Sequence, residues 1–281
     1  MTKYHALPLI TKYWKPGEDY LSVITDSVEK RIRERDYVVI SEKALSTAQS
    51  NVADESSIVP GCNAQLIALL WMRLWWGYFL GIFCHFGPRL LQRLRTYPSH
   101  AGSRHKQLAL QHAGLLQALM FGSEGGIDGS NLPYSLVSLP LKDVDLIARD
   151  IHNHVLFKLN KSVTVVIVDT DKTYSIGNFH FTPRPRPLKG IFSGGGLCMY
   201  LAGRFLNLRK RPTPLAVAGE HLTVEEALKI SNIADRARGP GSGSTVWDMA
   251  ARFKVGASDV TWAMLETLRH KPIVLVRKDT V

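Results

Sequence analysis

The chain has 281 residues, of which 45% are hydrophobic and 21% are charged, and its formal net charge is +11. This composition excludes a disordered or collagen-like chain, and the length fits one large globular domain or two smaller ones. The excess of Lys and Arg favours anionic partners such as nucleotides, phosphorylated cofactors, nucleic acid or acidic lipids. Charge alone does not choose among these partners.

The cysteines Cys62, Cys84 and Cys198 lie far apart and form no C-x-x-C pair. A disulfide framework and a cysteine zinc site therefore have no support. The first eight residues lack the long apolar stretch of a signal peptide. We therefore expect a protein of the reducing cytoplasm.

Hydrophobic periodicity predicts the secondary structure in chain order. Strands are expected at 5–10, 37–40, 163–168, 215–218 and 273–276. Helices are expected from the cap Asp19 to about Arg35, at 107–120, 143–159 and 223–238, from about Thr245, and after a cap at Ser258 or Asp259. Residues 181–197 are rich in Pro and Gly and predict a loop. Because strands and helices mix without strict alternation, the pattern indicates an α+β fold of mixed sheets with flanking helices.

Residues 66–86 are nearly all apolar, and three arginines follow at Arg89, Arg93 and Arg95. The segment is long enough to cross a bilayer. Arg73 and the central tryptophans count against a span, because tryptophan prefers the membrane interface. Three interpretations stay open: a buried or dimer-interface helix, a peripheral membrane helix, and a true span.

The first polar cluster with chemical potential is 125–131, which reads Gly-Gly-Ile-Asp-Gly-Ser-Asn. The glycines allow a close backbone approach to a ligand, Asp128 offers a hard oxygen ligand, and Asn131 offers a donor and an acceptor. The same composition also fits an ordinary surface turn stabilised by aspartate.

Two further clusters follow predicted strands. Asp169-Thr170-Asp171 comes directly after 163–168, where carboxylates could hold Mg²⁺ or Mn²⁺ against phosphates. In Ser41-Glu42-Lys43, the lysine could meet a phosphate as a point charge. The alternatives are an acidic turn and a solvated strand end.

The fourth cluster is the loop 236–245, which reads Arg-Ala-Arg-Gly-Pro-Gly-Ser-Gly-Ser-Thr. Glycines, hydroxyls and arginines together suit phosphate oxygens, and the helix expected from Thr245 would point its N-terminus there. The loop lacks the Gly-Lys-Ser/Thr of a Walker A motif, and a flexible linker is the alternative.

Other signals are weak. The run 193–196 lacks the spacing of a dinucleotide-binding loop, and His152 and His154 lie on different faces of their helix. Residues 209–211 read Arg-Lys-Arg, which we interpret as a solvated loop without a nucleic-acid role.

In their order along the chain, these clusters resemble the gamma-glutamyl ligase family that acts on the deazaflavin coenzyme F-420. The similar segments are Leu7-Pro8-Leu9-Ile10, Pro16-Gly17-Glu18-Asp19, the run from Ser41 to Ser46, Gly126-Ile127-Asp128-Gly129-Ser130-Asn131, Leu139-Pro140, Asp143-Val144-Asp145 with Ala148, and Val168-Asp169-Thr170. The resemblance covers the chain except for about residues 62–115 and 175–210.

The resemblance implies functional roles for particular residues. Asp128 and Asp169 would be catalytic as ligands of one metal ion, and Thr170 would be a ligand of a second. The nucleotide would contact Leu7, Pro8, Leu9, Ile10, Glu42, Lys43 and Asn131. The loop with Gly239, Gly241 and Ser242, extending to Ser244, would close the nucleotide pocket.

The implied reaction joins L-glutamate to a carboxylate of the deazaflavin precursor through an acyl phosphate made from GTP. The resemblance also implies Mg²⁺ or Mn²⁺, with K⁺ as a further candidate, and an intertwined homodimer of α+β fold. Residues 1–281 would form a single ligase domain with two interleaved subdomains, and 62–115 a helical, apolar, insertion-like segment.

The chain departs from the family pattern after Asp169-Thr170, where 171–175 replace a Gly-Arg turn. Two alternatives therefore stay open: a ligase of the same type acting on another anionic acceptor, and a non-catalytic, membrane-associated nucleotide-binding protein that uses 66–95 as its membrane contact.

Overall fold

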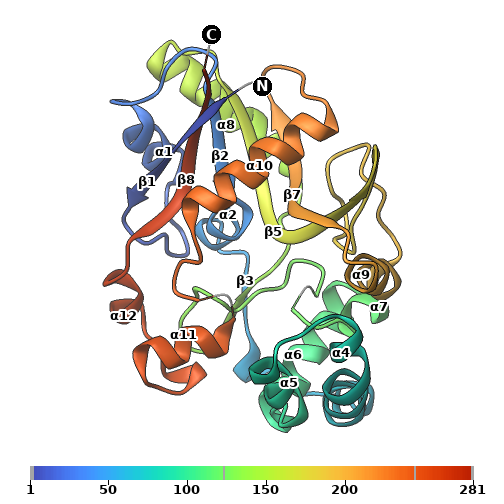
Figure 1. Ribbon diagram of the computed structural model, residues 1–281. Coiled ribbons are helices and arrows are strands. Elements are labelled where there is room, and N and C mark those ends of the chain that lie inside the picture. Colours follow the sequence, from blue (N-terminus) through green and yellow to red (C-terminus); the bar gives the residue numbers. More distant parts are fainter. Residues whose placement is uncertain (1–2, 123, 244, 280–281) are drawn as a thin grey trace.

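The main sheet of the computed structural model, which describes residues 3–122, 124–243 and 245–279, is mixed (Figure 1). Its strands are β1 (Tyr4–Thr11), β2 (Tyr37–Ser41), β5 (Thr164–Ile176), β6 (Phe179–Phe181), β7 (Arg209–Ala218) and β8 (His270–Lys278). The order is β1-β8-β2-β5-β6, and β7 also pairs with β5. The β2–β5 pair is parallel and the other pairs are antiparallel. The predicted α+β class is confirmed.

Helices cover both faces of this sheet. Val38 and Ile40 of β2 lie in one core, and Tyr37 and Val39 lie in another, because successive side chains of a strand point to opposite faces. The first face packs against α1 (Tyr20–Val28) and α8 (Val144–Leu159), and the second against α10 (Val224–Arg238). Burial on both faces explains why β2, β5 and β8 contain continuous apolar runs.

A group of helices forms a separate core below the sheet in Figure 1, and we call it the helical lobe. It contains α3 (Cys62–Leu66), a π-helix (Ile67–Leu80), α4 (Gly81–Phe83), α5 (Pro88–Arg95), α6 (Ser99–His112), α7 (Leu115–Ala118) and α9 (Gly196–Phe205). The first three are one continuous helix, Cys62–Phe83. We call it the long apolar helix.

Short elements connect the sheet to the helical lobe. They are α2 (Glu42–Ala48), β3 (Val52–Asp54), a 3₁₀ turn (Glu55–Ser57), β4 (Leu136–Ser138), α11 (Val246–Phe253), a second 3₁₀ turn (Ala257–Asp259) and α12 (Trp262–Glu266). β3 and β4 pair as a small antiparallel sheet. α11 and α12 pack around a small core with Tyr13.

Several predicted helix boundaries are wrong. The first helix ends at Val28 and not near Arg35. It cannot continue to Arg35, whose φ is 61°, and the Asp36 carboxylate accepts the Arg33 N–H (2.8 Å) in the turn that precedes β2. The helix expected at 107–120 starts at Ser99 and is divided at Gly114, whose φ is 92°. A helix cannot continue through such a residue.

Two other local predictions also fail. The last helix is capped by Thr261, whose hydroxyl accepts the Met264 N–H, and not by Ser258 or Asp259. Residues 209–211 are not a solvated loop but the start of β7. Arg211 is buried there because its guanidinium donates to Glu225 (2.7 Å) and to Ser175 Oγ (2.9 Å).

Candidate active site

A cavity of about 950 Å³ lies between the main sheet and the helical lobe. Four of its walls come from the polar clusters found in the sequence, which are far apart along the chain. They contribute Ser41 and Lys43, 128–131, 170–172 and 238–243. The helical lobe supplies the opposite wall. The fold thus brings together four segments that the sequence analysis had identified only as separate candidates.

The loop 125–131 is both a turn and a cavity wall, so its two interpretations are compatible. Asp128 Oδ1 accepts the Ser130 N–H (2.7 Å), as in an aspartate-stabilised turn. Its Oδ2 contacts the ammonium of Lys43, which also donates to Ser130 Oγ (2.7 Å) and to Ser130 O (3.0 Å). Lys43 lies in the first turn of α2 and therefore links this loop to the end of β2.

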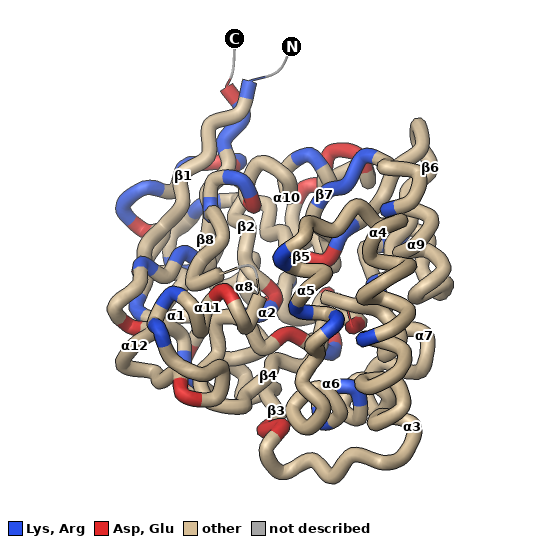
Figure 2. The backbone as a smooth tube through the Cα atoms, turned by 60° about the horizontal axis from the view of Figure 1, so that its bottom comes forward, with Lys and Arg blue, Asp and Glu red and all other residues tan. Residues whose placement is uncertain are grey.

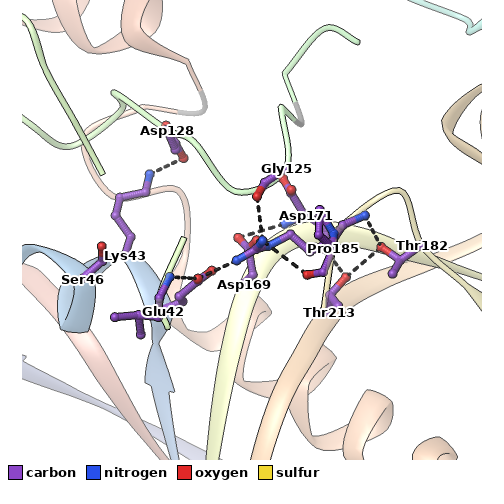
Figure 3. Close-up of polar contacts among 12 residues, drawn as sticks. Glu42, Lys43, Ser46, Gly125, Asp128, Asp169, Asp171, Thr182, Pro185 and Thr213 are labelled. Carbon is purple, nitrogen blue, oxygen red and sulfur yellow. Dashed lines mark hydrogen bonds and ion pairs between the residues drawn. The ribbon is translucent and has the colours of Figure 1, made fainter. Parts of the chain in front are cut away.

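Glu42, beside Lys43, belongs to a different network, which is centred on Arg184. Figure 3 shows Glu42 and Asp169 in this network, apart from the contact between Lys43 and Asp128. The guanidinium of Arg184 donates to Glu42 (2.5 Å), to Asp169 Oδ2 (2.6 Å) and to the Gly125 carbonyl (2.6 Å). Glu42 also accepts the Leu141 N–H (2.9 Å). Arg184 and Glu42 are both almost fully buried, so Arg184 joins the start of α2, β5 and the 125–131 loop.

The pKa values in this network follow from burial and charge. Burial raises the pKa of the Glu42 carboxyl to about 7, against the opposing effect of the Arg184 guanidinium. Burial lowers the pKa of Arg184, but Glu42 and Asp169 outweigh this effect and raise it. One cation therefore serves two carboxylates, and the three groups together carry excess negative charge only above the raised pKa of Glu42.

Gly126 is required by this arrangement. Its φ is 93°, and a Cβ atom there would lie 2.4 Å from Arg184 Cζ. Both the backbone conformation and the space demand glycine. Arg184 itself was missed in the sequence because it lies in the predicted loop 181–197. The alternation Thr-Pro-Arg-Pro-Arg-Pro at 182–187 was the available signal, since proline fixes the backbone around each arginine.

The strand before Asp169 does not end at Val168, as expected, but continues to Ile176. The register against β7 shifts between Asp169 and Lys172. Such an irregularity redirects side chains locally. Asp169 is turned to Arg184, whereas Thr170 and Asp171 line the cavity.

The loop after α10 is tied to the 125–131 loop through one side chain. Asn131 Oδ1 accepts both the Ser242 N–H (2.8 Å) and the Ser242 hydroxyl (2.6 Å). A Cβ atom at Gly241 would lie 2.7 Å from the same oxygen. Gly239 ends α10 with a φ of 76°, and α11 starts after its cap Thr245 as predicted. Ser244 lies outside the described residues.

Arg238, the last residue of α10, belongs to the cluster 236–245 whose arginines were expected to suit phosphate oxygens. Its Nε and Nη2 atoms are buried and have no hydrogen-bond partner within the described residues. Burial lowers the pKa of its guanidinium. Because Arg238 lines the cavity, its unmatched donors would suit an anionic ligand there.

The segment Leu7, Pro8, Leu9 and Ile10 lies in β1, where Leu7 to Leu9 pair with β8. Leu9 is buried in the core and Ile10 is 58% exposed. The cavity is lined instead by Tyr13 and Trp14, further along the chain. The Tyr13 hydroxyl donates to the Asn131 carbonyl (2.7 Å), and its ring stacks on His270 (4.3 Å). Nucleotide contact by the four β1 residues stays a prediction.

The wall from the helical lobe is aromatic and carries a second ionic network. Phe121 stacks on Trp247 of α11 (5.9 Å). His105 Nδ1 lies 2.5 Å from Glu55, and Lys106 donates to Glu124 (2.9 Å). Burial lowers the pKa of His105, but the two carboxylates outweigh it and raise the pKa to about 10. Sequence patterns did not identify this network, because its members come from separate elements.

Protein side chains could supply only some of the ligands that a hard divalent cation needs in this cavity. Within residues 3–122, 124–243 and 245–279, no group of three His, Cys, Asp or Glu side chains is arranged to hold a metal ion. Mg²⁺ commonly takes one or two carboxylates and completes its shell with substrate phosphates and water. Asp128 and Thr170 line the cavity, but Asp128 is paired with Lys43, and Asp169 is turned to Arg184. Metal binding by Asp128, Asp169 and Thr170 therefore stays a prediction from the resemblance.

Fold and site together define an enzyme-like α+β protein with one large charged cleft between a sheet and a helical lobe. The comparisons with known proteins specify the class. A model of the family described as "F420-0:Gamma-glutamyl ligase" matches residues 8–182. A protein of Methanocaldococcus jannaschii, described as uncharacterized, is 32% identical over 285 residues, covering 97% of this chain and 96% of the relative.

The chain therefore belongs to the coenzyme F-420-0:gamma-glutamyl ligase family, as the sequence motifs predicted. Membership in this family makes it an enzyme of the ligase class. The matched region contains both aspartate clusters and the lysine of α2, but it ends before Arg184 and the loop after α10.

Proposed function

We propose that this protein is a GTP-dependent ligase that adds L-glutamate to a carboxylate of the deazaflavin coenzyme precursor. The observation that carries the proposal is the tie between Asn131 and Ser242, which joins two loops of phosphate-binding composition at one end of the cavity. Lys43 and Arg238 line the same cavity and supply positive charge. Triphosphate binding at this end would leave the aromatic wall for the acceptor.

The proposed reaction has two steps. An oxygen of the acceptor carboxylate attacks the γ-phosphorus, the bond to the β-phosphate oxygen breaks, and GDP leaves. The amine nitrogen of L-glutamate then attacks the acyl carbon, the amine loses a proton, and phosphate leaves. Both steps gather negative charge, so cationic groups should supply most of the stabilisation.

Individual residues have separate roles in this proposal. Lys43 and Arg238 would contact phosphate oxygens, and Asn131 would hold the loop at Gly239, Gly241 and Ser242 around the nucleotide. Asp128, Asp169 and Thr170 would hold Mg²⁺ or Mn²⁺, which when bound neutralises charge on the phosphates. Glu42 would act indirectly, by holding the Arg184 guanidinium in place. K⁺ is a further candidate ion. The homodimer implied by the resemblance and the cytoplasmic location expected from the cysteines belong to the same proposal.

The segment 171–175 bears on the identity of the acceptor. Where other members have a Gly-Arg turn, this chain has 171–175, and Lys172 lies 3.6 Å from Asp235 at the cavity wall. Tyr174 from the same segment also lines the cavity. A ligase of the same type with another anionic acceptor is therefore the second candidate.

A mass-spectrometric assay with GTP, Mn²⁺, L-glutamate and the deazaflavin precursor tests the proposal. We expect a product heavier by one glutamyl unit together with an equal amount of GDP. GDP without that product would keep the nucleotide site and point to another acceptor. Folded protein that forms neither would favour the non-catalytic nucleotide-binding alternative. The Asp128→Asn variant serves as the matched control.

A further inference from the structure

The long apolar helix exposes a continuous apolar face. Every exposed position between Leu66 and Phe83 carries a large apolar side chain, with exposed fractions between 37% and 56%. These residues are Leu66, Leu69, Leu70, Leu74, Trp75, Tyr78, Phe79, Ile82 and Phe83. Soluble surfaces seldom expose so many neighbouring apolar side chains without a partner. We call these nine residues the apolar face.

The other side of the same helix is fastened to the helical lobe. Met72 and Trp76 are fully buried, and the Trp71 and Trp76 indoles both donate to the Leu119 carbonyl (2.7 and 2.8 Å). Arg73 donates to the Tyr97 carbonyl (2.8 Å). A helix with one side packed against protein along its length cannot be surrounded by lipid, although its 22 residues and mean hydropathy of 1.6 suffice for a span.

A neighbouring element widens the apolar face. Phe205 and Leu206, at the end of α9, are 58% and 56% exposed. The ring of Phe205 lies 6.1 Å from that of Phe83. The exposed apolar surface therefore spans two helices that are far apart in the sequence.

The surroundings of this face are positively charged. From Ser56 to Ser123 the chain contains no Asp or Glu, and it contains Arg73, Arg89, Arg95 and Arg104. Two further cations of this stretch have acidic partners elsewhere: Arg93 pairs with Asp248, and the buried Lys106 pairs with Glu124. In Figure 2 the tube at α5 carries Lys or Arg colouring, whereas α4 is uncharged. Arg89 of α5 is exposed. Apolar and aromatic side chains next to arginines are the composition of a surface-bound membrane helix.

We propose that the apolar face docks on the surface of an anionic lipid bilayer, with the long apolar helix parallel to the membrane plane. Trp75 and Tyr78 would lie at the headgroup level, where such rings are favoured. A second copy of the chain is a poorer occupant. In a two-fold dimer the same surface of each copy faces the other. The arginine-bearing segments of the two copies would then face each other, and their like charges would repel.

Vesicle co-sedimentation tests this proposal, with vesicles of phosphatidylcholine alone and vesicles that also contain phosphatidylglycerol. We expect the protein to pellet with the anionic vesicles, to be released by salt, and to stay in solution with the neutral ones. The double variant Trp75→Ser/Phe79→Ser should lose at least about tenfold in partitioning. Phe157→Ser is the matched control, because Phe157 is 85% exposed on α8 and lies outside the apolar face.

Light scattering measures the oligomeric state of the parent and the double variant, and circular dichroism measures their helix content. The double variant should keep the helical spectrum of the parent, because both side chains are half exposed. Protein that ignores both kinds of vesicle would overturn the proposal. So would a dimer that the double variant converts to monomer while lipid binding is absent, since the face would then be an interface between copies.

Discussion

The main sheet and the helical lobe both bury charged side chains beside the cavity, but they balance them differently. On the sheet side, Arg184 alone serves Glu42 and Asp169. In the lobe, His105 and Lys106 face Glu55 and Glu124, two cations for two carboxylates. The lobe network is neutral, whereas on the sheet side one cation is shared by two carboxylates, one of which, Glu42, has a pKa raised by burial to about 7. The lobe network therefore needs no further partner, and the charge of the sheet network depends on the protonation of Glu42.

The largest expected effect tests whether Arg184 stabilises the sheet side by pairing with Glu42 and Asp169. Arg184→Met should lower the free energy of unfolding by about 3–5 kcal/mol, because two buried carboxylates lose their partner. Urea unfolding measures this change. Arg209→Met is the control, since Arg209 is 64% exposed beside Glu225 and should change stability by less than about 0.5 kcal/mol. Equal losses of unfolding free energy in the two variants would contradict this stabilising role of Arg184.

Two adjacent tryptophans test the two-sided nature of the long apolar helix. Trp76→Ala should cost about 3–5 kcal/mol, because Trp76 is fully buried in the lobe core. Trp75→Ala should cost less than about 1 kcal/mol, because Trp75 is 52% exposed. Thermal or urea unfolding compares them directly. A large loss in Trp75→Ala without lipid would mean that this face is covered in the free protein.

Asp128→Asn tests the catalytic role of the sheet side. Turnover should fall by about 100–1000-fold, because the residue proposed to hold the divalent ion beside the phosphates loses its charge, while the unfolding curve changes little. Asp26→Asn on the exposed side of α1 is the control and should keep full activity. Asp169→Asn should lose activity and stability together, since the buried Arg184 also loses a charge-assisted hydrogen bond. Near-normal turnover in Asp128→Asn would take this residue out of the site.

The last prediction concerns pH and the helical lobe, where the expected change within any one pH unit is small. The pKa of His105 is raised to about 10 from an ordinary 6.5, so its charged form stabilises the fold fully below pH 6.5. That stability is lost as the pH rises toward 10, at no more than about 1.4 kcal/mol per pH unit. Urea unfolding across this range should show a flatter dependence for His105→Gln than for the parent. The exposed His100→Gln is the control, and parallel curves for all three proteins would contradict the network.

Patterns that repeat along the chain were predictable. The strands at 37–40 and 163–168 are apolar on both faces, and the structure places helices on both sides of them. The cap at Thr223 with Glu226 announced α10, and the motifs around Asp128 and Asp169 identified the family. Each of these signals depends on a few neighbouring residues, so the sequence carries it locally.

The contacts that make the cavity could not be found in this way. Arg184 meets Glu42 across 142 positions, and Ser242 meets Asn131 across 111. These pairs depend on how β2, β5 and the 125–131 loop converge, and ion pairs leave no periodic trace in a sequence. The same holds for the long apolar helix, whose composition fits a core, an interface or a membrane. Only its packing against Leu119 and Tyr97 separates the covered side from the exposed one, because burial is a property of the folded neighbours and not of the helix.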